Sequence, residues 1–159
     1  MHPLPTKPAL DLPAVDALIS AARHRAVQLG GRFTVVVVDD AANLRSLFRG
    51  DGADPLTVGL ASGKARLSAS NGMPTRDWRS VVGNDPYLGL TVPTVLDQLL
   101  TGAVLFAGGY PIVVEQTVVG AIGASGGTED EDDDVARAGL AALPFADQFT
   151  AQPASHTAP

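Results

Sequence analysis

Apolar residues recur every three or four positions between residues 15 and 29, and a continuous run of valines follows. The first pattern is that of one face of a helix, and Asp11 stands before it as a capping residue. The β-branched segment Phe33–Asp39 predicts a buried strand. Because Leu44–Gly50 continues after a short polar link, the two segments are expected to pair as an antiparallel hairpin.

The pattern returns to helical and then to strand character further along the chain. Asp54-Pro55 is typical of a helix start, and this helix is expected to run to about Ser70. Glycines and prolines interrupt residues 71–90, so that stretch is expected to be irregular. The remaining predicted elements are a short helix over 92–100, strands Pro111–Val114 and Thr117–Gly123 around a tight turn at Glu115-Gln116, and a last helix from Thr128 to Leu143.

This order of elements predicts one α/β (α+β) domain in which helices flank an antiparallel sheet, since the hairpins occur without βαβ alternation. The domain is expected to span residues 10–145. Residues 1–9 and 146–159 lack a hydrophobic period and are rich in proline and alanine, so both are predicted to be flexible tails.

Composition narrows the function classes. The 159-residue chain is 45% hydrophobic, yet no stretch approaches the length of a membrane span, and its proline-rich start does not resemble a signal peptide. Cysteine is absent, which removes disulfides and thiolate chemistry and fits a cytoplasmic protein. The net charge of −6 argues against a nucleic-acid partner. The many valines and a mean hydropathy of +0.16 predict a homo-oligomer.

The segment Gly123–Gly127 matches the Gly-x-Ser-x-Gly pattern of serine hydrolases, with Ser125 at the nucleophile position. Such a site also needs a histidine base and an acid further along the chain. The one later histidine is His156, in the predicted tail, and no parallel sheet is expected. Ser125 is therefore predicted to be structural or hydrogen-bonding, and not an acylated nucleophile.

The same glycines do not form a phosphate-binding motif, because their spacing departs from Gly-x-Gly-x-x-Gly and no lysine follows. Gly120 and Gly123 are interpreted as positions of a strand bulge or of a close approach by another backbone. The acidic run that follows begins with a capping box formed by Thr128 and Glu131. Since it lacks the spacing of a calcium loop, it is interpreted as a mostly solvated helix start, and no metal site is predicted.

The strongest family likeness lies in GGYPIVV and VVGAIGASGGTEDEDDDVARAGLAAL, which resemble segments of the GlcG/HbpS family. This family is described as haem-binding or haem-degrading and is related to a C-terminal domain of PduO-type proteins. Two turns depart from its pattern, Asp40-Ala41-Ala42 and Glu115-Gln116, and the stretch around Arg76, Trp78 and Tyr87 has no clear counterpart in it. The positions that match are Asp39, Asp51, Gly52, Ala53, Lys64, Ala65, Pro74, Thr75, Gly108, Gly109, Pro111, Gly120, Gly123, Ser125, Gly126, Gly127 and Asp132.

The resemblance implies a profilin-like fold, a small-molecule ligand such as haem or another tetrapyrrole, and assembly into oligomers. Haem iron needs an axial ligand, usually His, Cys, Met or Tyr. His24 is the one histidine between the predicted tails, and it lies between two arginines on a polar helix face, where solvent exposure is the more frequent outcome. Met73 and Tyr87 are weaker candidates, so the cofactor and its ligand stay open.

The alternatives are a metal-free enzyme of isomerase, cyclase or lyase type and an oligomeric accessory protein. In the enzyme, Lys64 would bind an anion or carbonyl group or act as a base, and Asp39 or Asp132 would serve as a carboxylate base. Structural roles are equally open, with Lys64 paired to Asp51 or Asp54. The residues expected around the ligand are Lys64, Arg66, Thr75, Arg76, Trp78, Ser125 and Gly126.

Overall fold

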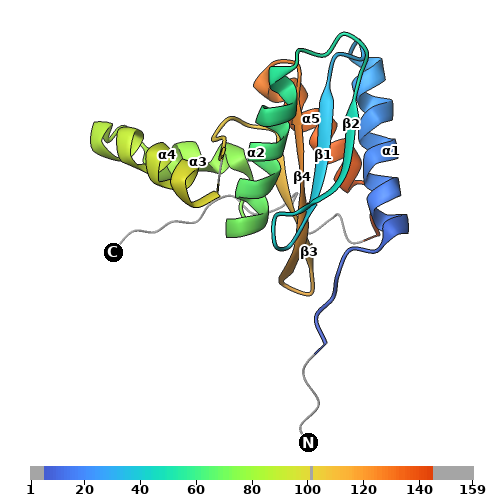
Figure 1. Ribbon diagram of the computed structural model, residues 1–159, viewed down its shortest axis with the longest axis horizontal. Coiled ribbons are helices and arrows are strands. Elements are labelled where there is room, and N and C mark those ends of the chain that lie inside the picture. Colours follow the sequence, from blue (N-terminus) through green and yellow to red (C-terminus); the bar gives the residue numbers. More distant parts are fainter. Residues whose placement is uncertain (1–5, 101, 145–159) are drawn as a thin grey trace, which may run out of the picture.

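The computed structural model describes residues 6–100 and 102–144 of the chain. Helices and strands follow one another in the predicted order (Figure 1). The elements are α1 (Leu12–Gln28), β1 (Thr34–Asp39), β2 (Leu44–Arg49), α2 (Leu56–Asn71), the 3₁₀ helix η1 (Thr75–Asp77), α3 (Trp78–Val82), α4 (Pro86–Leu100), β3 (Gly109–Val114), β4 (Thr117–Ser125) and α5 (Glu129–Leu140).

The strands of this described part form one antiparallel sheet in the order β2-β1-β4-β3. Thr34 pairs with Ser125 at one end of the central β1–β4 ladder, and Asp39 pairs with Gly120 at the other. The tight turn between β3 and β4 is present, with φ of 47° at Glu115 and 66° at Gln116, as a two-residue hairpin turn requires. The predicted α+β domain with an antiparallel sheet is confirmed.

Helices cover both faces of the sheet and give three layers. α1 and α5 pack side by side on one face, and α2 packs on the other (Figure 1). Val35 and Val37 of β1 face the α1–α5 layer, where the larger core forms. Val36 and Val38 face α2. Because β1 is buried on both faces, its sequence shows no alternation of polar and apolar residues.

Two glycines of β4 lie where another backbone approaches the strand closely, and at Gly123 that backbone is α2. A Cβ atom on Gly123 would lie 2.2 Å from the carbonyl oxygen of Ala61 in α2. A Cβ atom on Gly120 would lie 2.4 Å from the carbonyl oxygen of Val38 in β1. The close backbone approach predicted at these strand glycines is confirmed.

The stretch expected to be irregular contains more helix than predicted. η1, α3 and the start of α4 all lie within it, so α4 begins at Pro86 and not near Val92. Asp85 starts α4 by accepting a hydrogen bond of 2.8 Å from the Tyr87 amide. Gly72, Gly83 and Pro86 are tolerated here because they lie at helix ends, whereas Gly89 lies inside α4. α3 and α4 extend away from the sheet on the side of α2 (Figure 1).

The ends of the domain differ slightly from the predictions. The last helix ends at Leu140, before the predicted Leu143. The predicted C-terminal tail and residues 1–5 lie outside the described residues. Within the rest of the predicted N-terminal tail, Lys7 forms an ion pair with Asp40. Across residues 6–100 and 102–144, no helix combines the length and the apolar character needed to cross a membrane.

Candidate functional site

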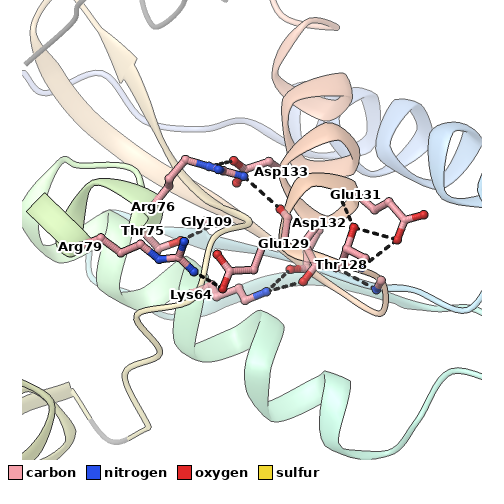
Figure 2. A network of polar contacts seen from close by, with 12 residues as sticks. Lys64, Thr75, Arg76, Arg79, Gly109, Thr128, Glu129, Glu131, Asp132 and Asp133 are labelled. Carbon is pink, nitrogen blue, oxygen red and sulfur yellow. Dashed lines mark hydrogen bonds and ion pairs between the residues drawn. The ribbon is translucent and has the colours of Figure 1, made fainter.

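A buried ion pair joins the two helical layers at the end of the sheet where β4 finishes. Lys64 of α2 donates from Nζ to Asp132 Oδ2 of α5 at 2.6 Å and to the carbonyl oxygen of Ala124 at 3.0 Å (Figure 2). The exposed fractions of the two side chains are 2% and 6%. Lys64 thus pairs with Asp132, and not with Asp51 or Asp54.

The backbone encloses this ion pair. Gly108 has φ of +112°, and a Cβ atom there would lie 2.6 Å from the Ala124 carbonyl oxygen and 3.1 Å from Lys64 Nζ. The Gly127 amide donates to Asp132 Oδ1 at 3.0 Å. Burial raises the pKa of the Asp132 carboxyl above its ordinary value, and the neighbouring Lys64 ammonium acts against that rise. The two groups neutralise each other inside the protein, so neither offers an open charge to a ligand.

Thr75 and Arg76 attach the segment after α2 to β3 and α5. The buried hydroxyl of Thr75 accepts a hydrogen bond of 2.9 Å from the Gly109 amide. Arg76 pairs with Asp130 at 2.6 Å. It also pairs with Asp133 (Figure 2). These contacts fix η1 against the sheet and thereby position α3, which follows it directly.

An apolar hollow of about 430 Å³ opens between α3 and the segment before β3. Its volume is within the usual range for small-molecule sites. Trp78 and Phe106 provide aromatic surface, and Phe106 is 58% exposed. Arg79 is the charged residue of the hollow and pairs with Glu129 of α5 (Figure 2). The residues that line this apolar hollow are Trp78, Arg79, Val82, Gly83, Asn84, Leu105 and Phe106.

Two buried polar atoms, one on a residue that lines this hollow and one on the ion-pair partner of Arg79, have no hydrogen-bond partner within the described residues. One is Nε1 of Trp78, and the other is Oε2 of Glu129, whose Oε1 accepts from Arg79. A buried polar group without a partner costs on the order of 1–3 kcal/mol. A ligand that brings an acceptor to the Trp78 N–H therefore removes a penalty that the free protein carries.

The described residues lining the apolar hollow include no His, Cys, Met or Tyr, the side chains that usually coordinate haem iron. His24 is exposed on α1, with Nε2 placed 3.1 Å from Nε2 of Gln28, and α1 covers the other face of the sheet (Figure 1). Met73 is half-buried after α2, and Tyr87 is 73% exposed on α4. The hollow thus fits an apolar, aromatic ligand but does not supply an iron ligand.

Most of the predicted site residues lie in one region. Ser125 is the last residue of β4 and is 4% exposed. Gly126 follows it in the turn into α5, where a Cβ atom would lie 2.3 Å from the carbonyl oxygen of Arg32. The fold gathers seven predicted residues around the starts of α5, β3 and α3: Lys64, Thr75, Arg76, Trp78, Ser125, Gly126 and Asp132.

Asp39 and Arg66 lie apart from that region. Asp39 is at the far end of the β1–β4 ladder, and its Oδ1 accepts hydrogen bonds from the amides of Ala41 and Asn43 at 3.0 and 2.9 Å. Its carboxylate therefore holds the turn of the β1–β2 hairpin. Arg66 is half-buried on α2 and does not line the apolar hollow.

The acidic run of α5 is less solvated than predicted. Its capping box is confirmed, since Thr128 and Glu131 each accept a hydrogen bond from the other's backbone amide. Asp132 and Asp133, however, are only 4% and 7% exposed. They precede the buried Ala136 by four and three residues, which places all three on the inward face of α5. That spacing is the signal that the sequence-based interpretation missed.

The chain is similar to known proteins over most of its length. A family model described as "Haem degrading protein HbpS-like" matches residues 10–141. Protein GlcG of Escherichia coli (strain K12) is 31% identical over 120 residues, which make up 76% of this chain and 84% of that protein.

Solved structures have a similar fold. The crystal structure of a PduOC:heme complex has a TM-score of 0.77 and 28% sequence identity, covering 86% of this chain and 96% of that one. A double mutant of HbpS from Streptomyces reticuli has a TM-score of 0.76 and 32% identity, covering 88% of this chain and 90% of that one.

Proposed function

We propose that this chain, which belongs to the HbpS-like family of haem-degrading proteins as its sequence predicted, binds a tetrapyrrole in the apolar hollow. The observation that carries the proposal is the indole N–H of Trp78, which is buried at an aromatic hollow without an acceptor. Of the relatives, PduOC has been crystallised as a heme complex. Membership of the family supports a small-ligand-binding role. That the ligand is a tetrapyrrole is our proposal.

The lining matches a flat aromatic ring system that carries carboxylates. Trp78 and Phe106 present ring surfaces on which a porphyrin can stack. One guanidinium nitrogen of Arg79 donates to Glu129. Because a guanidinium carries five N–H donors, further donors remain for a propionate group of the porphyrin. The Trp78 N–H offers a second donor to the same kind of group.

Binding is expected to depend on the ring and not on the metal, because the described lining holds no axial ligand. Haem, when bound, supplies an iron centre, and the residues of this chain supply ring contacts and carboxylate donors. Metal-free protoporphyrin IX should therefore bind about as tightly as hemin. His24, exposed on α1, should not contribute.

The test is a pair of titrations, with hemin followed by its Soret band and protoporphyrin IX by its fluorescence. Trp78→Phe keeps an aromatic wall and removes the N–H, so both affinities should fall about tenfold, the value of one hydrogen bond to a charged group. Tyr87→Phe is the matched control, since it removes a polar hydrogen from an exposed aromatic side chain outside the hollow. Tight binding of hemin with no binding of protoporphyrin IX would refute the metal-independent mode.

The enzyme alternative finds little support in its candidate bases. Lys64 and Asp132 are bonded to each other in the interior, and Asp39 is bonded to its own turn. Ser125 stays predicted to be structural or hydrogen-bonding, and not an acylated nucleophile. None of these residues lines the apolar hollow.

A homo-oligomer is the assembly we infer, and α4 is the surface that supports it. This helix contacts the rest of the described domain only sparsely and exposes several apolar side chains. Contiguous apolar surface of this kind marks association sites. Among the described side chains of α4, the large exposed apolar ones are Tyr87, Leu88, Leu90 and Val95.

A further inference from the structure

A second, polar hollow of about 400 Å³ lies where Tyr110 of β3 meets the outer side of α5. It shares no lining residue with the apolar hollow. Charged and hydroxyl groups dominate its wall, in contrast to the aromatic wall of the tetrapyrrole site. The residues that line this polar hollow are Arg76, Tyr110, Asp130, Asp133, Asp134 and Arg137.

Asp133 is the residue of this wall whose hydrogen bonding suggests that the hollow binds a ligand. It is only 7% exposed, and its Oδ2 accepts from Arg76 (Figure 2). Its other oxygen, Oδ1, is buried and has no hydrogen-bond partner within the described residues. A buried carboxylate oxygen is a strong acceptor, and leaving it unpaired is costly. The Tyr110 phenol is a donor beside this carboxylate, yet Oδ1 accepts no hydrogen bond from the described residues.

The other charges of the polar hollow are engaged, with one exception. Arg76 is held by Asp130 and Asp133, and Asp134 pairs with Arg25 of α1 at 2.5 Å. Arg137 is exposed, and no ion pair to it occurs in the described part of the chain. The hollow thus presents one carboxylate oxygen, Asp133 Oδ1, that accepts no hydrogen bond, and one cation, Arg137, that makes no ion pair within the described residues.

We propose that the polar hollow binds a small zwitterion whose ammonium group donates to Asp133 Oδ1 and whose carboxylate pairs with Arg137. A charged donor suits an ionised carboxylate better than a hydroxyl does, because charge-assisted hydrogen bonds are roughly twice as strong. A simple cation would satisfy Asp133 but meet the repulsion of Arg137. A metal ion is not favoured, since no group of three or more His, Asp or Glu suited to one occurs among residues 6–100 and 102–144.

The spacing of the two groups limits the size of the ligand. Asp133 and Arg137 are separated by one turn of α5, so their Cβ atoms are about 5–6 Å apart. Because both groups project from one side of the helix, the ligand is expected to carry its ammonium and carboxylate close together, as α- and β-amino acids do. Tyr110 borders the same space, and burial together with the Asp133 charge raises the pKa of its phenol, so the hydroxyl stays neutral and can accept from the same ammonium.

The test compares three probes that differ by one charged group each. β-Alanine carries both groups, propionate lacks the ammonium, and ethylamine lacks the carboxylate. Backbone amide shifts of Tyr110, Asp133 and Arg137 are followed by NMR as each probe is added. We expect saturable shifts with β-alanine and at least tenfold weaker binding of the other two. No saturable shift with β-alanine, or equal affinity for propionate or ethylamine, would overturn the proposal.

Two variants locate the contacts. Arg137→Gln removes an exposed charge that makes no ion pair, so the fold should persist while β-alanine binding falls at least tenfold. Arg32→Gln, an exposed arginine outside the hollow, is the charge-matched control and should bind normally. Asp133→Asn should also weaken binding, and a circular dichroism spectrum checks that the loss of its pair with Arg76 has not unfolded the protein. Unchanged binding by a folded Arg137→Gln variant would rule the proposal out.

Discussion

The ammonium of Lys64 lies 2.6 Å from the carboxylate of Asp132, and this contact joins helices on opposite faces of the sheet. α2 and α5 meet here beside Gly108, where no side chain fits. The charged pair therefore fixes how the two helical layers are placed relative to each other. The apolar and polar hollows both border elements that this pair holds in position.

Removal of Lys64 should destabilise the protein strongly. Lys64→Met leaves the buried Asp132 without its partner, which is expected to cost about 3–5 kcal/mol. Urea unfolding followed by circular dichroism measures the change. The double variant Lys64→Met/Asp132→Leu removes both charges and should recover much of the loss. A single variant as stable as the parent would show that the pair contributes nothing.

Gly123 should not tolerate a methyl group. In Gly123→Ala the added Cβ would lie 2.2 Å from the Ala61 carbonyl oxygen, so α2 must move away from β4, at a cost of about 1–3 kcal/mol or more. Gly59→Ala is the matched control within α2, because a Cβ there meets nothing within 4 Å. That substitution should stabilise the protein by about 0.5–1 kcal/mol, because alanine favours helix. Thermal unfolding distinguishes the Gly123→Ala and Gly59→Ala variants. Equal melting temperatures for both would contradict the close contact between Gly123 and α2.

Tyr110 should make stability fall at high pH. Burial, followed by the charge of Asp133, raises the pKa of its phenol above the ordinary value of about 10. Since the folded protein holds this proton more tightly than the unfolded chain, the stabilisation is present below pH about 10 and is lost as the pH rises further. In Tyr87→Phe, Tyr110 is the remaining tyrosine. Its absorbance at 295 nm should then change only well above pH 10, and a change near pH 10 would argue against a buried phenol.

Phe106 and His24 should affect hemin binding in different ways. Phe106→Ser removes exposed ring surface from the apolar hollow, so affinity should fall several-fold while stability changes little. His24→Ala changes an exposed position on α1 and should leave affinity unchanged. Soret titrations compare both with the parent protein. A large loss of affinity in His24→Ala would identify an iron ligand and move the site away from the hollow.

A charge on α4 should weaken self-association. Leu90 is 76% exposed, and Leu90→Lys would place an ammonium in the apolar surface of this helix. Light scattering after size exclusion should show smaller particles than for the parent chain. Val27→Lys on α1, where Val27 is 61% exposed, adds the same charge elsewhere and should leave the mass unchanged. Equal masses for all three proteins would exclude α4 as the interface.

The sequence by itself determined the element order, the antiparallel hairpins and the family, because these depend on local signals. A few neighbouring residues are enough to predict the structural role of the valine run of β1, the capping box at Thr128 and the glycines of β4. These signals operate through backbone conformation and hydrophobic period, which neighbours in the chain largely fix.

Tertiary structure alone decided which charges meet. Asp39, Lys64 and Asp132 look alike as candidates along the chain, yet Asp39 lies at the far end of the sheet while the other two bond across 68 positions. Asp133 resembles any carboxylate of a helix start until β3 and Arg76 cover it. The burial and ion pairing of these side chains depend on contacts between segments far apart in the sequence, so a local sequence pattern cannot predict them.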